Sequence, residues 1–334
     1  MSVIVADSID RVMSIEIRYG GGSHPRGFKV PLYNAAREKQ GGQPLVYLAA
    51  RKLHEIVQKR DVVMLVTGAG GPLTLVKGET DGPMGAASLG RVLDFGLGAR
   101  TVYVSDPPFL EPIRASVEAC GISVLNETCF EKRIHSALTE EFPMGPEAAR
   151  AAAIRLLDTY KPKAVIFIEK VGPTAEGTFH SVTGTAKDPK DVAHSHVLCD
   201  MARDRDIFTL GIGDGGNEIG SGVIHEEVCR LHPNGKTIAT VTKTDIFVFA
   251  SVSNWGAYGV AAYLAHELRN VDFFQNEEME DYMLRRCVAA GAMDGSHAAQ
   301  ILWVDGVPSR TNLAIVTLMR DIVDHGLKSH SRPF

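Results

Sequence analysis

The chain has 334 residues, 45% of them hydrophobic and 22% charged, with a formal net charge of -5 at pH 7. These values suit a globular protein with one large or two ordinary domains, and the acidic balance excludes a basic field for nucleic acid or anionic lipid. Five scattered cysteines without a CxxC pair favour a reducing compartment over a disulfide scaffold. Because we find no apolar run of roughly 20 residues and no secretory signal pattern, we expect a cytoplasmic protein without a membrane segment.

Residues 1–42 are expected to form an N-terminal arm or loop, since Gly20–Gly22 is followed by His24 and Pro25. Helices are then predicted over residues 44–59, 86–95, 112–119, 146–159, 192–203, 260–269, 277–290 and 312–325. Strands are predicted over residues 62–66, 101–104, 122–125, 164–168, 207–211 and 245–250. This alternation predicts an α/β domain over residues 43–334, with a mostly parallel sheet and helices on both faces. Two α/β lobes, divided near residue 145, are the alternative.

Side chains with oxygen atoms recur at the carboxyl ends of the predicted strands, where ligands bind in open parallel sheets. They are Glu79 and Asp81 after residues 62–66, Asp106 after 101–104, Glu169 after 164–168, Asp214, Asn217 and Glu218 in GIGDGGNEIG after 207–211, and Asn254 after 245–250. Each acid alone could be a turn former, a helix cap or the partner of a lysine. Their coincidence at one edge of the sheet predicts a common site.

Carboxylates that crowd into one crevice repel each other, and a bound divalent cation would make the crowding tolerable. Oxygen ligands favour Mg²⁺ or Mn²⁺, with Ca²⁺ as an alternative. A nucleotide cofactor is not expected, because the chain has no P-loop and no clean GxGxxG followed by the usual acid. His180 and His297 lie in glycine-containing loops and could act as acids or bases, although surface or core positions explain them more simply.

Five segments carry a resemblance to a known family. They are Gly78–Gly96 (GETDGPMGAASLGRVLDFG), Ile168–Gly184, Gly211–Gly222, Ser253–Leu264 and Met293–Pro308. In these segments and in their order, the chain resembles the D-glutamate cyclase family, specifically its C-terminal catalytic domain. The resemblance implies an α/β protein that converts D-glutamate or a close analogue to 5-oxo-D-proline with loss of water. It also implies a divalent metal in an acidic cavity.

For this reaction, we expect a metal held by some of Glu79, Asp81, Asp214 and Glu218 to act as a Lewis acid. Glu169 or Asp106 would take a proton from the substrate ammonium. Lys77 or Lys170 would help to anchor the substrate carboxylate. The substrate-binding set would be Gly213, Gly215, Gly216, Asn217 and Asn254, with backbone N–H groups of the glycine turn facing the ligand.

Two other classes of function remain open at this point. The same acidic crevice could activate water in a divalent-metal-dependent hydrolase or phosphatase. Alternatively, the chain could bind an acidic metabolite without catalysis. In each case the expected partner is a small acidic molecule, and the sequence leaves open whether the chain forms a homo-oligomer.

Overall fold

A seven-stranded sheet forms the centre of the computed structural model, which describes residues 2–17 and 26–328. The strand order is β3-β4-β2-β1-β5-β8-β9, and every neighbouring pair is parallel. The strands are β1 (Val62–Thr67), β2 (Arg100–Ser105), β3 (Ser123–Val124), β4 (Ser136–Glu141), β5 (Ala164–Ile168), β8 (Phe208–Gly213) and β9 (Ile246–Phe249). The predicted α/β class and parallel sheet are confirmed.

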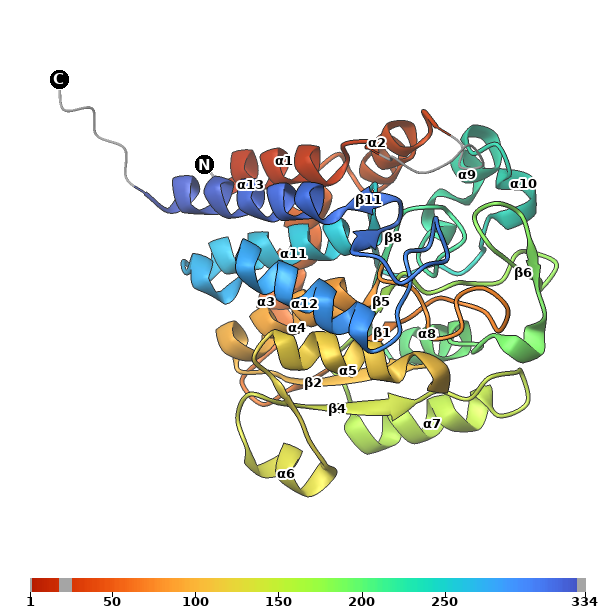
Figure 1. Ribbon diagram of the computed structural model, residues 1–334, viewed down its shortest axis with the longest axis horizontal. Coiled ribbons are helices and arrows are strands. Elements are labelled where there is room, and N and C mark those ends of the chain that lie inside the picture. The colour runs from red at the N-terminus through yellow and green to blue at the C-terminus, as the bar shows by residue number, and fades with distance from the viewer. Residues whose placement is uncertain (1, 18–25, 329–334) are drawn as a thin grey trace.

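Helices surround this sheet, as Figure 1 shows. They are α1 (Ser2–Met13), α2 (Lys29–Lys39), α3 (Leu45–Ile56), α4 (Pro83–Leu97), α5 (Leu110–Ala119), α6 (Glu127–Lys132), α7 (Ala149–Tyr160), α8 (His196–Arg203), α9 (His225–Leu231), α10 (Gly235–Ile238), α11 (Ser253–Glu267), α12 (Glu277–Ala289) and α13 (Ser309–Leu327). The structure also contains two short antiparallel hairpins outside the central sheet. One pairs β6 (Phe179–His180) with β7 (Ala186–Lys187), and the other pairs β10 (Trp303–Val304) with β11 (Val307–Pro308). Within the described ranges, no helix combines the length and the hydropathy required to cross a bilayer.

The sheet buries both of its faces, which explains why β1 is a continuous apolar run. Val62, Met64 and Val66 pack into one hydrophobic cluster with residues of α7 and α8. The alternate residues Val63 and Leu65 belong to a larger cluster with residues of α3, α4 and α11. Successive side chains of a strand point to opposite faces, so β1 joins the two layers of helices.

The strand order places a crossing point between β1 and β5. From β1 the chain continues to β2 on one side, whereas from β5 it continues to β8 and β9 on the other side. The loops that follow β1 and β5 therefore leave the sheet in opposite directions. A crevice at the carboxyl ends of such a strand pair is the usual ligand position in doubly wound sheets.

The first 42 residues differ from the expected arm or loop. Residues of α1 and α2 belong to the larger hydrophobic cluster, and α1 lies beside α13 in Figure 1. The predicted loop markers Gly20–Gly22, His24 and Pro25 lie outside the described residues. Residue 145, the expected lobe boundary, lies between β4 and α7, and strands on both sides of it belong to the same sheet.

Candidate functional site

A cavity of about 630 Å³ lies at the carboxyl edge of the sheet, beyond the ends of β1, β5 and β8. Residues 69–75, which follow β1, form one wall, and residues 181–188 of the β6–β7 hairpin form another. Eight acidic residues line it: Glu79, Asp81, Glu169, Asp188, Asp191, Asp214, Glu218 and Asp305. Among the lining residues that the structure describes, Lys187 is the only cation. The cavity is therefore strongly acidic.

Asp214 lies at the centre of the acidic cluster. Its carboxylate forms one group with Asp81 and Asp305 and another with Glu169 and Glu218, and within each group the oxygen atoms lie within 4.8 Å of one another. Of the four predicted metal ligands, Asp214 thus lies near Asp81 in one group and near Glu218 in the other. Glu79, the fourth, lines the same cavity but does not belong to either of these groups in the described part of the chain.

Asp81 is fixed by the N-terminus of α11. Its carboxylate accepts hydrogen bonds from the backbone N–H groups of Ser253 (3.0 Å) and Asn254 (2.7 Å), where the helix dipole favours negative charge. The side chain of Asn254 makes a second connection between α11 and the loop that contains Asp81, because its Oδ1 accepts hydrogen bonds from the N–H groups of Gly82 (2.8 Å) and Gly85 (2.7 Å). Asn254 is buried and used internally, so this predicted substrate-binding residue instead joins the loop after β1 to α11.

Glu218 is held by the glycine turn that precedes it. Its two carboxylate oxygens accept hydrogen bonds from the N–H groups of Gly215 (2.7 Å) and Gly216 (2.8 Å). A Cβ at Gly213 would lie 2.8 Å from Oε2 of Glu218, which requires glycine there. The N–H groups of Gly215 and Gly216, predicted to anchor a substrate carboxylate, therefore bind the carboxylate of Glu218, and Gly213 provides space for it.

Glu169 directly follows β5 and has a backbone φ of 48°, in the left-handed region that L-residues rarely adopt. Such a conformation costs on the order of 1 kcal/mol and persists only where the surroundings impose it, most often at functional sites. The hydroxyl of Ser253 donates a hydrogen bond to the Glu169 carboxylate. The strained backbone thus directs this acid toward the cluster that contains Asp214.

Asp214 contacts a buried cation from α2. The Nζ of Lys29 lies 2.6 Å from the Asp214 carboxylate and 2.6 Å from its backbone carbonyl oxygen, and Lys29 is only 1% exposed. Sequence analysis missed Lys29, because it lies 185 residues away in the segment expected to be an arm. Helix α2 thus supplies a positive charge that compensates the negative charge of the acidic cluster.

Four acids of the cavity hold their protons more tightly than isolated carboxyls do. Burial and the charge of Asp214 raise the pKa of Asp81 to about 7, although the N–H groups of α11 oppose this shift. Removal from water, together with neighbouring carboxylates, raises the pKa of Glu79 and Glu169 well above the usual range. The same two causes raise the pKa of Glu218. The cluster is therefore suited to binding a proton or a cation.

Three predicted catalytic residues do not line this cavity. Lys77 is half exposed and lies 3.7 Å from Glu111 on the surface. Lys170 and Asp106 form a buried ion pair with each other, and Lys170 also donates to the carbonyl of Gly68 (2.9 Å). This pair connects the loops after β1, β2 and β5 and has no charge left for a ligand. Lys77 and Lys170, predicted to anchor the substrate carboxylate, therefore lie outside the lining of the cavity.

The two histidines considered as acids or bases are not among the residues that line the cavity, although their chain neighbours Ser181, Ser296 and Ala298 are. His180 contacts the hydroxyl of Thr178 (3.0 Å), and His297 contacts the carboxylate of the buried Asp294 (2.6 Å). Conversely, the cavity includes Asp305 and Lys187, which sequence analysis missed. Asp305 precedes Gly306 in the last of the five resembling segments, and an acid in such a turn was a signal that could have identified it.

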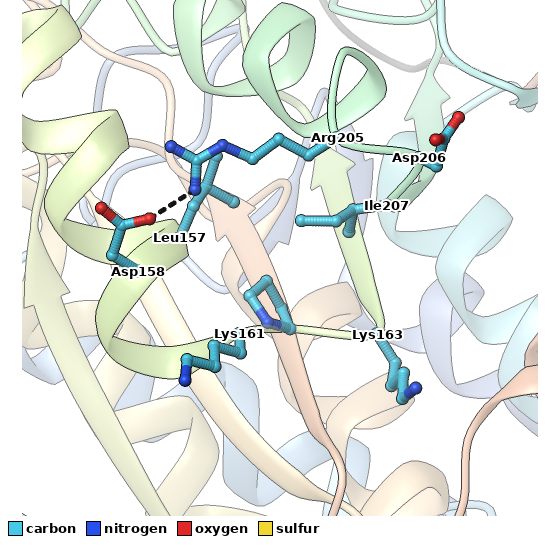
Figure 2. Close-up of a pocket in the computed structure, with 8 residues that line it drawn as sticks. Leu157, Asp158, Lys161, Lys163, Arg205, Asp206 and Ile207 are labelled. Carbon is cyan, nitrogen blue, oxygen red and sulfur yellow. Dashed lines mark hydrogen bonds and ion pairs between the residues drawn. The ribbon is translucent and has the colours of Figure 1, made fainter.

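A second hollow, of about 490 Å³, lies at the opposite, amino edge of the sheet. Figure 2 shows it between Lys163, which precedes β5, and Ile207, which precedes β8. Arg205 reaches across to Asp158, and their ion pair measures 2.6 Å. Lys161 and Lys163 extend away from this pair. Both members of the pair are open to solvent, so this hollow has no buried excess charge.

The doubly wound parallel sheet, with an acidic cavity at its crossing point, defines an α/β protein whose candidate site is rich in buried carboxyl groups. The chain belongs to the D-glutamate cyclase-like family, because the family model described as "D-glutamate cyclase-like, C-terminal" matches residues 35–320. The resemblance found in the sequence is thereby confirmed.

Comparison with individual proteins agrees with this family. The human mitochondrial D-glutamate cyclase is 29% identical over 169 residues, which is 49% of this chain and 25% of the human protein. The match thus spans a quarter of the length of that relative. Among solved structures, the probable sor operon regulator from Shigella flexneri aligns with 69% of this chain and 91% of its own. That alignment has 12% identity and a TM-score of 0.26.

Proposed function

We propose that this protein is a lyase that cyclises D-glutamate, or a close analogue, to 5-oxo-D-proline with loss of water. The observation that carries the proposal is the convergence of Asp81, Glu169, Asp214 and Glu218 in one cavity at the crossing point of the sheet. Membership of the D-glutamate cyclase-like family supports the reaction class. The cavity has the volume that small-molecule sites require, which is roughly 300–1,000 Å³.

The reaction joins two ends of one molecule. The amine nitrogen forms a bond to the γ-carboxyl carbon, one C–O bond of that carboxyl breaks, and the oxygen leaves as water. The ammonium gives up two protons and the departing oxygen takes up two. The catalyst therefore needs groups that exchange protons near neutral pH, and it needs to hold the substrate in its folded conformation.

The acids of the cavity fit a hard divalent cation such as Mg²⁺ or Mn²⁺. All of the converging ligand atoms are carboxylate oxygens, which such cations prefer. In addition, Oδ1 of Asn217 lies buried at the cavity without a hydrogen-bond donor among the described residues. Asp214 would hold the cation together with either Asp81 and Asp305 or Glu169 and Glu218, the two groups whose oxygen atoms lie within 4.8 Å of one another. When bound, the cation would polarise the γ-carboxylate as a Lewis acid.

Glu169 is the residue best suited to move protons. The raised pKa of the Glu169 carboxyl makes it a better proton acceptor than an ordinary glutamate, so it could take a proton from the ammonium and return it to the departing oxygen. The strained backbone and the hydroxyl of Ser253 hold the carboxyl in one orientation, so that little reorganisation is needed during the reaction. Asp81, with a pKa of about 7, is a second group that can share the proton.

Incubation of the purified protein with D-glutamate tests the proposal. We expect 5-oxo-D-proline to appear, to be detected by chiral chromatography with mass spectrometry, and to decrease when a chelator is added. L-Glutamate serves as the stereochemical control. If the protein releases phosphate from phosphorylated metabolites and forms no lactam, the result would reject the cyclase and support a hydrolase. If the protein binds D-glutamate without turnover, the result would reject the cyclase and support a protein that binds an acidic metabolite without catalysis.

A further inference from the structure

Lys187 joins the two walls of the acidic cavity. It lies in β7 of the hairpin that forms one wall, and its Nζ donates a hydrogen bond of 2.7 Å to the carbonyl oxygen of Gly70 in the opposite wall. An ammonium group has three N–H donors, and this contact uses one of them. The other two are available on a group that lines the cavity.

The charge around Lys187 makes this position unusual. Eight acidic residues line the cavity, whereas Lys187 is the single cation of its described lining. Burial lowers the pKa of Lys187, and the charge of Glu79 opposes that shift. The hydroxyls of Ser181 and Thr183 contact each other at 2.9 Å, so one of these two neutral donors of the hairpin is already used.

The substrate of the proposed reaction brings a difficulty that this lysine resolves. Glutamate has two carboxylates, of which only the γ-carboxylate reacts, while the α-carboxylate keeps its charge throughout. Entry of that second carboxylate into an acid-lined cavity is opposed by repulsion unless a positive group receives it. Charge-assisted hydrogen bonds to an ammonium are the strong way to receive a carboxylate.

We propose that Lys187 binds the carboxylate of the substrate that does not react, and that it thereby selects a dicarboxylic amino acid. This inference rests on the proposed function and adds the residue that determines specificity. The same contact closes the cavity, since Lys187 holds the hairpin against the loop that contains Gly70. Lys187 is therefore both a receptor for the substrate and a link between the two walls.

Substrates that differ in a single charge test the proposal. D-Glutamate is compared with its α-amide, in which the carboxylate that does not react is neutral and the γ-carboxylate is unchanged. For Lys187→Gln, we expect KM for D-glutamate to rise roughly 10- to 100-fold, the size of a lost hydrogen bond to a charged group, with a small change in kcat. KM for the α-amide should change less than about threefold, because its carboxamide never used the ammonium.

Controls separate this role from a structural one. Lys190→Gln removes an exposed lysine three positions along the chain and should leave both KM values unchanged. Lys187→Arg keeps the charge and should restore most of the affinity for D-glutamate. If Lys187→Gln weakens both substrates equally, Lys187 is only a link between the walls and the proposal is overturned. If that variant does not fold, a wild-type preference for D-glutamate over the α-amide below about tenfold overturns it instead.

Calorimetric binding distinguishes this inference from the proposed function. Binding of D-glutamate without lactam formation, with at least a tenfold loss in Lys187→Gln, would support the role of Lys187 and reject the cyclase. Lactam formation with equal KM values in wild type and Lys187→Gln would keep the cyclase and reject the role of Lys187. Absence of D-glutamate binding in the wild type would reject both.

Discussion

At the amino edge of the sheet, Arg205 and Asp158 neutralise each other at 2.6 Å and remain in contact with solvent. At the carboxyl edge, Asp81, Asp214 and Glu218 are buried together, and they are held mostly by backbone N–H groups and by one lysine from α2. Both regions are hollowed and charged. Only at the carboxyl edge do charges of one sign predominate and lie removed from water, which is costly unless the site uses them. Uncompensated buried charge therefore identifies the site better than shape does.

The largest expected difference in stability between the two edges of the sheet concerns the Lys29–Asp214 pair. Lys29→Met leaves a buried carboxylate without its partner, so the free energy of unfolding in chelator should fall by about 3–5 kcal/mol. Urea denaturation measures this change. Lys52→Met, which removes a solvent-accessible lysine of α3, should change it by less than about 0.5 kcal/mol. In the double variant Lys29→Met with Asp214→Asn, part of the loss should be recovered; strictly additive losses would contradict a direct interaction.

Asp214→Asn tests the centre of the acidic cluster. This residue is shared by both groups of converging acids, so the affinity for Mg²⁺ or Mn²⁺ should fall at least about 100-fold, beyond the effect of an outer-shell partner. Turnover should fall with it. Calorimetric titration of the cation gives the affinity, and Asp158→Asn at the amino edge is the matched control. Unchanged cation binding in Asp214→Asn would remove this residue from the proposed metal site.

The raised pKa of Asp81 predicts how stability depends on pH. The folded protein holds this proton more tightly than the unfolded chain, in which the carboxyl has a pKa of about 4. The stabilisation is therefore complete below that value and is lost as pH rises through the folded pKa of about 7. In chelator, the free energy of unfolding should decrease by about 2 kcal/mol from pH 5 to pH 8.

Two comparisons check the origin of this pH dependence. A saturating divalent cation should flatten the curve, since the cation then replaces the proton as the partner of the acids. Asp81→Asn should flatten it in chelator as well. A stability that rises between pH 5 and pH 8 in chelator would show that groups outside the acidic cluster dominate.

The smallest expected effect belongs to the amino edge. Arg205→Ala removes a solvent-exposed ion pair with Asp158, so the free energy of unfolding should change by at most about 1 kcal/mol. Lactam formation should be unaffected. Thermal unfolding and the chromatographic assay measure the two quantities. A loss of activity in this variant would break the distinction drawn between the two edges of the sheet.

Much of the fold was predictable, because the alternation of short apolar runs with amphipathic helices has local physical causes. β1 and β5 are buried on both sides and were visible as apolar runs. β4 was missed, since its sequence SALTEE ends in two glutamates and does not resemble a buried strand. Helices α1 and α2 were missed for another reason, because the glycines at Gly20–Gly22 and the proline at Pro25 stand between them in the sequence and suggested a loop.

The acids of the site were predictable from their positions after the strands, but their partners were not. Glu218 bonds to Gly215 and Gly216, and Asp81 bonds to the start of α11, and such pairings are set by the folded backbone. Lys29 and Lys187 carry no motif that distinguishes them from surface lysines. Residue type and strand ends indicate where charges gather, whereas the compensating groups come from tertiary contacts.

The position of Lys29 has a consequence for where this unit can be cut. The family match starts at residue 35, yet the ammonium that accompanies Asp214 comes from before that residue. A fragment that began at the limit of the match would keep every strand of the sheet and lose the lysine of the buried ion pair at the acidic cluster. The boundary of recognisable ancestry and the boundary of the electrostatically complete unit are therefore different.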